Sequence, residues 1–156
     1  MRIEPAAARR AALAGAALAA SLAFAPAALA QNLGSPVGLW KTIDDDTKEP
    51  KSLVRIVEKD GVLSGRVEKI LTAGKADAKC EQCTDERKDQ PVQGMTIISG
   101  MKRSGEQWEH GSILDPNNGK VYSSRMKLLE GGKKLEVRGF VGVSLFGRSQ
   151  TWIREE

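Results

Sequence analysis

The chain has 156 residues and a formal net charge of +4, and its charged residues are spread along the sequence without forming a basic block. This distribution argues against nucleic acid as a partner, because nucleic-acid-binding surfaces gather Lys and Arg together. The sequence also lacks the motifs of phosphate-binding loops, nucleophile elbows and zinc proteases, so we expect no enzymatic activity and no cofactor.

Residues 1–30 have the organisation of a secretory signal peptide. Three arginines form a positively charged start, an apolar run of Ala and Leu follows, and Ala28-Leu29-Ala30 supplies a small-x-small cleavage site. The uncharged run has about 14 residues, fewer than the roughly 20 that span a bilayer. We therefore expect a cleaved signal peptide, a mature chain of residues 31–156 without a membrane span, and a periplasmic or secreted location in a bacterium. Cleavage removes three Arg and one Glu, which lowers the net charge from +4 to +2.

The rest of the chain reads as one all-β domain. Runs rich in Val, Ile and Leu alternate with Gly, Asp and Asn at a spacing of about 8–12 residues, which is typical of sandwiches and barrels. Short turns between sequential runs make neighbouring strands antiparallel. A meander without helices hides its edges by closing, so we predict an antiparallel up-and-down β-barrel. Its eight predicted strands are Gly38–Ile43, Ser52–Glu58, Val62–Leu71, Met95–Met101, Gln107–Leu114, Lys120–Leu129, Lys134–Phe140 and Ser144–Arg154.

Trp40 opens the first predicted strand and Arg154 closes the last one. In a closed meander these two strands are neighbours, so the two side chains should meet. A guanidinium over an indole face contributes about 0.5–2 kcal/mol, depending on exposure. We predict a structural cap in which Trp40 plugs one end of the barrel and Arg154 or Arg148 covers it.

Several predicted strands alternate apolar and polar residues, which assigns one face of each to the interior. Eight strands enclose an interior that is either filled by side chains or just wide enough for one small ligand. We predict a ligand cavity lined by large inward-facing side chains. The candidate lining residues are Leu63, Val67, Trp108, Tyr122, Met126, Leu128 and Val137. A hydroxyl on this face, that of Tyr122, needs an interior partner or a ligand.

Cys80 and Cys83 form a C-x-x-C motif in a long polar segment, Thr72–Pro91. A structural zinc needs four Cys or His ligands, and the sequence adds only one histidine, so we expect no metal site. In an oxidising compartment the pair is best explained as a disulfide that restrains the loop. Two alternatives stay open: a thiol–disulfide protein that uses this pair, and a cell-envelope interaction module that acts through residues 72–91.

A further group of polar and aromatic residues falls on the middle and late strands. An isolated histidine is more often a surface or core residue than a catalyst, and an aspartate at a turn is explained by bonds to its own backbone. The group therefore predicts no catalytic arrangement. It consists of Trp108, His110, Asp115, Tyr122, Arg125, Arg138 and Arg148.

Two compound motifs, D-P-x-x-G-K-x-Y and V-R-G-x-x-G, occur in the segments "GSILDPNNGKVYSS" and "LEVRGFVGVSLFGRSQTWIR". With "GLWKTIDDDTKEPKSLVRI" and "CEQCTDERKDQPVQGMTII", they make residues 36–154 resemble an uncharacterised family of secreted bacterial proteins, domain of unknown function 2147. The resemblance implies a lipocalin-like, calycin-type barrel in the periplasm, and barrels of this type bind small apolar or amphipathic molecules. It implies no catalytic residues, because the family has no established activity. The G-x-W opening and W-x-R close fit the lipocalin signature, which implies the same capping roles for Trp40 and Arg154.

Overall fold

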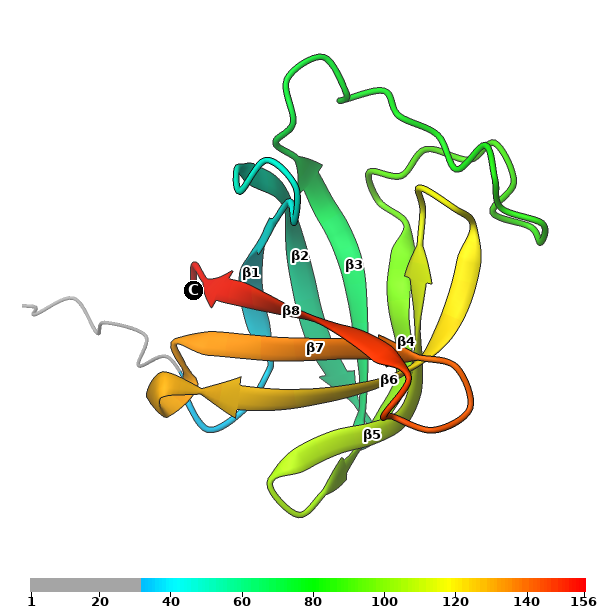
Figure 1. Ribbon diagram of the computed structural model, residues 1–156. Coiled ribbons are helices and arrows are strands. Elements are labelled where there is room, and N and C mark those ends of the chain that lie inside the picture. The colour runs from blue at the N-terminus through cyan, green and yellow to red at the C-terminus, as the bar shows by residue number, and fades with distance from the viewer. Residues whose placement is uncertain (1–31) are drawn as a thin grey trace, which may run out of the picture. The chain divides into compact units, whose positions relative to one another are not determined.

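The computed structural model describes residues 32–156, so the predicted signal peptide lies outside the described residues. Eight strands form a closed barrel in which each strand pairs antiparallel with its neighbours in sequence and the first pairs with the last (Figure 1). The predicted all-β antiparallel barrel is confirmed. The strands are β1 (Gly38–Ile43), β2 (Pro50–Lys59), β3 (Val62–Ile70), β4 (Thr96–Ser104), β5 (Gln107–Asp115), β6 (Lys120–Leu129), β7 (Lys134–Phe140) and β8 (Gly147–Arg154), with a 3-10 turn, η1 (Glu130–Gly132), between β6 and β7.

The last strand begins later than the sequence predicts, at Gly147 and not at Ser144. Here the side chain of Arg138 forms hydrogen bonds in place of backbone pairing between β7 and β8. The guanidinium of Arg138 donates to the carbonyl oxygens of Ser144 and Leu145, at 2.7 and 3.2 Å. These carbonyls therefore bond to a side chain of β7 and not to its backbone, and residues 141–146 form a loop.

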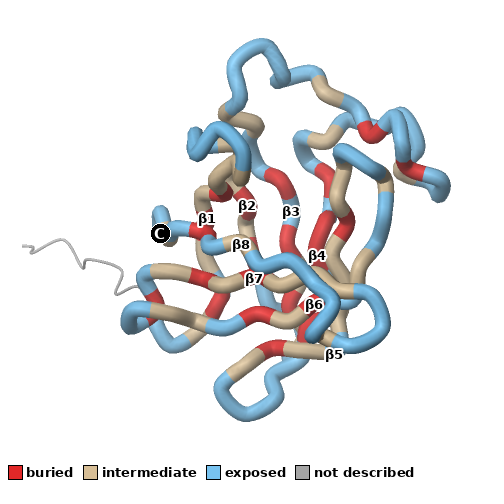
Figure 2. The backbone as a smooth tube through the Cα atoms, viewed as in Figure 1, coloured by how far each residue is buried: buried red, intermediate tan, exposed pale blue. Residues whose placement is uncertain are grey.

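The inward faces of the strands pack into one continuous apolar core. Trp40, Trp152 and Met126 are among its largest fully buried side chains. Figure 2 shows that most buried positions follow the strands, as expected when one face of each strand turns inward. Burial of this apolar surface is the main favourable contribution to folding.

One end of the barrel is sealed where β1 starts and β8 ends. Trp40 and Arg154 are cross-strand partners, and the guanidinium carbon lies 4.2 Å from the centroid of the indole ring. The indole Nε1 donates to the carbonyl oxygen of Pro36 at 2.7 Å. The guanidinium donates to the carbonyl oxygens of Ser35 and Gly132, at 2.6 and 2.7 Å. These bonds fasten the segment before β1 and the β6–β7 turn over the buried indole.

The long β3–β4 connection is organised around a disulfide between Cys80 and Cys83, which confirms the predicted bond. Both cysteines are buried, with exposures of 0% and 2%. Figure 2 shows that the loop is mostly exposed apart from short buried stretches. A bridge between Lys79 and Pro91 closes the inner part of the loop, which carries the two cysteines. The loop also packs on the β5–β6 turn, because a side chain at Gly119 would collide with the backbone of the loop.

Candidate ligand-binding site

A bulge in β5 sets the geometry of the candidate site. The pairing of β5 with β6 shifts register between Trp108 and Gly111, and His110 adopts a positive φ of 63°. A bulge inserts an extra residue, bends the strand and redirects side chains. Glycine is required beside the bulge, because a side chain at Gly111 would collide with Met101 and with the backbone of β4.

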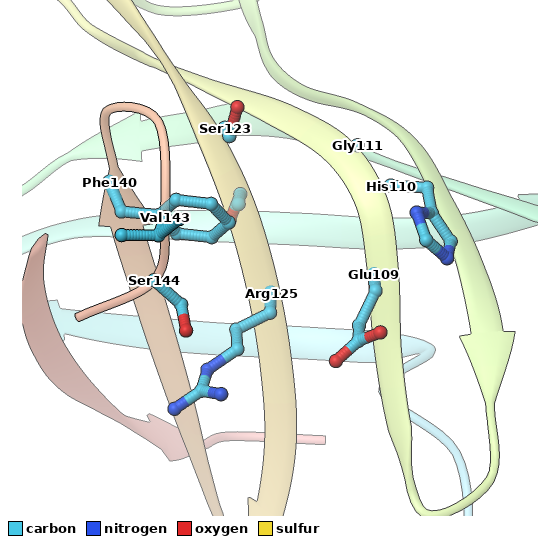
Figure 3. A pocket seen from close by; sticks show the side chains of 9 residues that line it. Glu109, His110, Gly111, Ser123, Arg125, Phe140, Val143 and Ser144 are labelled. Atoms are coloured by element: carbon cyan, nitrogen blue, oxygen red, sulfur yellow. The ribbon is translucent and has the colours of Figure 1, made fainter. Parts of the chain in front are cut away.

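A cavity of about 500 Å³ lies beside this bulge, between β5, β6, the end of β7 and the β7–β8 loop (Figure 3). The cavity is open to solvent, and its volume falls within the range of about 300–1,000 Å³ that is typical of small-molecule sites. The cavity is lined by Glu109, His110, Gly111, Ser123, Ser124, Arg125, Phe140, Val143 and Ser144.

Strand alternation shows which wall of the barrel carries the cavity. Ser123 and Arg125 flank the buried Ser124, so their side chains point away from the interior. Phe140 of β7 is the cross-strand partner of Ser123 and shares its outward face. The cavity therefore extends along the outer wall, where the β7–β8 loop folds back and contributes Val143.

Two polar atoms at the cavity are buried without a hydrogen-bond partner among residues 32–156. They are the hydroxyl oxygen of Ser124, a residue that is 1% exposed, and the guanidinium Nε of Arg125. A buried polar group that lacks a partner costs about 1–3 kcal/mol, and more when the group is charged. Because the Ser124 side chain turns toward the barrel interior, a ligand in the outer cavity would bond to the Arg125 guanidinium, which extends along the cavity in Figure 3.

The other walls of the cavity combine polar and apolar groups. Figure 3 shows the carboxylate of Glu109 and the guanidinium of Arg125 extending in the same direction from neighbouring strands, whereas His110 points away from them. Ser144 adds a hydroxyl from the loop, and Phe140 adds an aromatic face. The arrangement suits an amphipathic molecule. Residues 32–156 contain no cluster of three or more His, Cys, Asp or Glu that could hold a metal ion.

The residues predicted to line an interior cavity lie elsewhere. Tyr122 is partly exposed, and its hydroxyl accepts a hydrogen bond at 3.0 Å from the amide nitrogen of Asn118 in the β5–β6 turn. Leu128 is partly buried and packs against the core. The five others belong to the core itself, and none of the seven borders the 500 Å³ cavity. These five are Leu63, Val67, Trp108, Met126 and Val137. As a ligand site, the set remains a prediction.

Sequence reasoning singled out two cavity residues, His110 and Arg125, and missed the others. One signal was present in the sequence, because an isolated glycine inside a predicted strand, here Gly111, often marks a bulge. The contributions of Ser123 and Phe140 had no local signal, since they depend on how β6 and β7 pair.

The family described as "Uncharacterized protein conserved in bacteria (DUF2147)" matches residues 38–154. The chain belongs to this family. Among solved structures, the barrel is similar to protein HP1028 from the human pathogen Helicobacter pylori, which is described as belonging to the lipocalin family. The two share 18% sequence identity with a TM-score of 0.68, over 78% of this chain and 84% of that chain.

At this identity the likeness shows the fold alone, so this DUF2147 protein has a lipocalin-like barrel. A comparison with curated proteins finds no match. Within residues 32–156, no helix has the length and apolar character needed to cross a membrane.

Proposed function

We propose that this DUF2147 protein is a non-enzymatic protein of the periplasm or the secreted fraction that binds a small amphipathic ligand. The observation that carries the proposal is the 500 Å³ cavity, in which Phe140 and Val143 lie beside the Arg125 guanidinium, whose Nε has no hydrogen-bond partner among residues 32–156. The lipocalin-like fold supports ligand binding as an analogy only, because one fold hosts many functions. The signal-peptide pattern of residues 1–30 supports the location.

The cavity chemistry narrows the kind of ligand. Arg125 offers a donor to a carboxylate, phosphate or carbonyl oxygen, and a bond to a charged donor contributes about 1.5–3 kcal/mol. Glu109 favours a ligand that also carries a donor, such as a hydroxyl or an amine. Phe140 and Val143 accept a short hydrocarbon portion. The expected ligand is therefore a small molecule with a polar head and an apolar chain.

The disulfide is a poor candidate for redox chemistry. Thiol–disulfide exchange requires a thiolate to reach one of the two sulfurs, and both Cys80 and Cys83 are buried. This burial supports a structural role for the bond. The alternative of an interaction module acting through residues 72–91 can be tested separately, by asking whether deletion of the loop abolishes capture of envelope proteins.

The proposal is tested by native mass spectrometry of the purified protein after exposure to bacterial lipid extracts. We expect a bound mass, and we expect Arg125→Met to weaken binding of the identified molecule at least tenfold. Arg66→Met is the matched control, because Arg66 also lies on an outward strand face but does not line the cavity. A protein that carries no bound mass, or equal binding by both variants, would overturn the proposal.

A second variant distinguishes the outer cavity from the barrel interior. Val137→Phe adds volume inside the core, where Val137 is buried, and circular dichroism establishes whether the variant folds. If a folded Val137→Phe variant loses the ligand and Arg125→Met keeps it, the ligand occupies the interior and the outer-cavity assignment is wrong.

A further inference from the structure

The β7–β8 loop exposes a run of large apolar side chains. Val141, Val143, Leu145 and Phe146 are 68%, 59%, 77% and 71% exposed, and Figure 2 shows the loop exposed along almost its whole length. The other exposed large apolar residues of the barrel strands are isolated and less exposed; they are Val57, Val121 and Ile153. Single exposed apolar residues need no explanation, whereas a contiguous apolar patch marks an interaction site.

Part of the backbone of this loop is hydrogen-bonded within the protein. The carbonyl oxygens of Ser144 and Leu145 accept bonds from Arg138. The amide of Phe146 donates to the carbonyl oxygen of Val143 at 3.1 Å, and the amide of Val141 donates to that of Phe146 at 3.3 Å. Four consecutive carbonyls thus have donors. Because a bilayer offers no water to exposed carbonyls, this bonding lowers the cost of moving the loop into an apolar layer.

The sequence of the loop and its flanks carries charges of one sign, whereas two acidic residues lie near it in space: Asp45 beside Arg148, and Glu109 on the cavity that Val143 and Ser144 also line. From residue 137 to residue 153 the sequence contains Arg138 and Arg148 and no Asp or Glu. Arg138 spends its hydrogen bonds on neutral oxygens, so its charge has no ion-pair partner among residues 32–156. Arg148 is two-thirds exposed and pairs with Asp45. An apolar tip with the cationic Arg138 at its base, free of an ion-pair partner among the described residues, complements a surface of anionic lipid headgroups.

We propose that residues 141–146 dock the protein on an anionic membrane surface by inserting the apolar side chains of the loop into the headgroup layer. Arg138 holds the loop in the inserted conformation, and Arg148 lies against the headgroups. Because Val143 and Ser144 also line the cavity, docking brings the cavity next to the lipid. The docking itself does not depend on the proposed ligand binding.

Co-sedimentation with vesicles tests the proposal. Vesicles of phosphatidylethanolamine with phosphatidylglycerol are compared with vesicles of phosphatidylcholine alone. We expect the wild-type protein to bind the anionic vesicles and to release as salt is raised, because surface charge is screened. Leu145→Asp and Phe146→Asp should each lower the partition coefficient at least tenfold. Val57→Asp and Val121→Asp are the matched controls and should change it less than twofold.

Two results would overturn membrane docking: a wild-type protein that binds neither vesicle, and loop variants that bind as well as the controls. Analytical ultracentrifugation tests the alternative that the apolar patch binds a second copy of the chain. If the wild type is a dimer that Phe146→Asp dissociates, and vesicles are not bound, the loop pairs two copies of the chain and the proposal is wrong. Retention of a ligand by Phe146→Asp in native mass spectrometry would show that docking and ligand binding are separate properties.

Discussion

Two arginines at different places in the barrel make the same kind of contact with opposite results. Arg154 donates to backbone carbonyls of the segment before β1 and of the β6–β7 turn, and Arg138 donates to backbone carbonyls of the β7–β8 loop. The first arrangement covers Trp40, which has no exposed surface. The second holds Leu145 and Phe146 in the open. The same type of arginine–carbonyl contact therefore buries Trp40 at one end of the barrel and keeps the apolar side chains of the β7–β8 loop exposed.

The Arg154 contact contributes to stability, whereas the Arg138 contact is better explained by binding. At the sealed end, burial lowers the pKa of Arg154, a cost that carbonyl acceptors and an indole face offset. Such a contact is expected where excluding water from the core stabilises the folded protein. At the β7–β8 loop, the exposed apolar surface stabilises nothing in the isolated chain, so a binding role is the better explanation.

Removing an aromatic ring at each place should give the sharpest contrast. We expect Trp40→Ala to lower the free energy of unfolding by about 3–5 kcal/mol, because it leaves a cavity in a packed core. Phe146→Ala, at a site that is 71% exposed, should change it by less than about 0.5 kcal/mol. Urea unfolding of both variants measures the two values. A large loss for Phe146→Ala would mean that the loop packs against the barrel, and the contrast would fail.

Replacing each arginine by lysine keeps the charge and removes the planar set of donors. Arg154→Lys should lower the free energy of unfolding by about 1–3 kcal/mol, because carbonyls at the sealed end lose their hydrogen-bond partners. Arg138→Lys should lower it by less. Its main effect should be faster hydrogen exchange at the amides of Val141 and Phe146, whose bonds depend on the loop conformation. Unchanged exchange at these amides would show that the loop holds its shape without Arg138.

The sealed end could be predicted from the sequence, because its determinants are local. Alternation and turn glycines gave three strands with the bounds that the structure shows, namely β1, β6 and β7. The order of the strands then made β1 and β8 neighbours, which brings Trp40 and Arg154 together without any knowledge of packing.

The candidate site could not be predicted in the same way. The cavity depends on a one-residue register shift at His110 and on the long reach of Arg138 to the β7–β8 loop. Neither leaves a periodic pattern, and the sequence assigns Leu145 and Phe146 of the loop to the start of the last strand. The interior was predicted as a ligand cavity because large inward side chains can either line a space or fill it, and a sequence does not distinguish the two.

The disulfide loop is intermediate between the sealed end and the β7–β8 loop, because it contains buried cysteines but is otherwise mostly polar and exposed. In the loop-entropy estimate, a ring as short as that closed by Cys80 and Cys83 contributes about 2 kcal/mol. We expect the double variant Cys80→Ala, Cys83→Ala to lose no more than this in urea unfolding and to be cleaved faster within residues 72–91 by protease. Ligand binding and vesicle binding should be unchanged. Loss of either would give the sulfurs a functional role and favour the thiol–disulfide alternative.

The smallest effect should come from the ion pair between Asp85 and Arg87 on the surface of the same loop. Hydrogen bonds from Arg87 lower the pKa of Asp85 to about 2, from about 3.9 in an unfolded chain. A depressed carboxyl pKa stabilises the folded state above pH 4, and this contribution disappears as the pH falls towards 2. Asp85→Asn should therefore lower the melting temperature slightly at pH 6 and less at pH 2, where Asp85 is about half protonated, relative to wild type at each pH. Because the pair is exposed and screened by solvent, a large difference at pH 6 would mean that it helps to hold the buried disulfide in place.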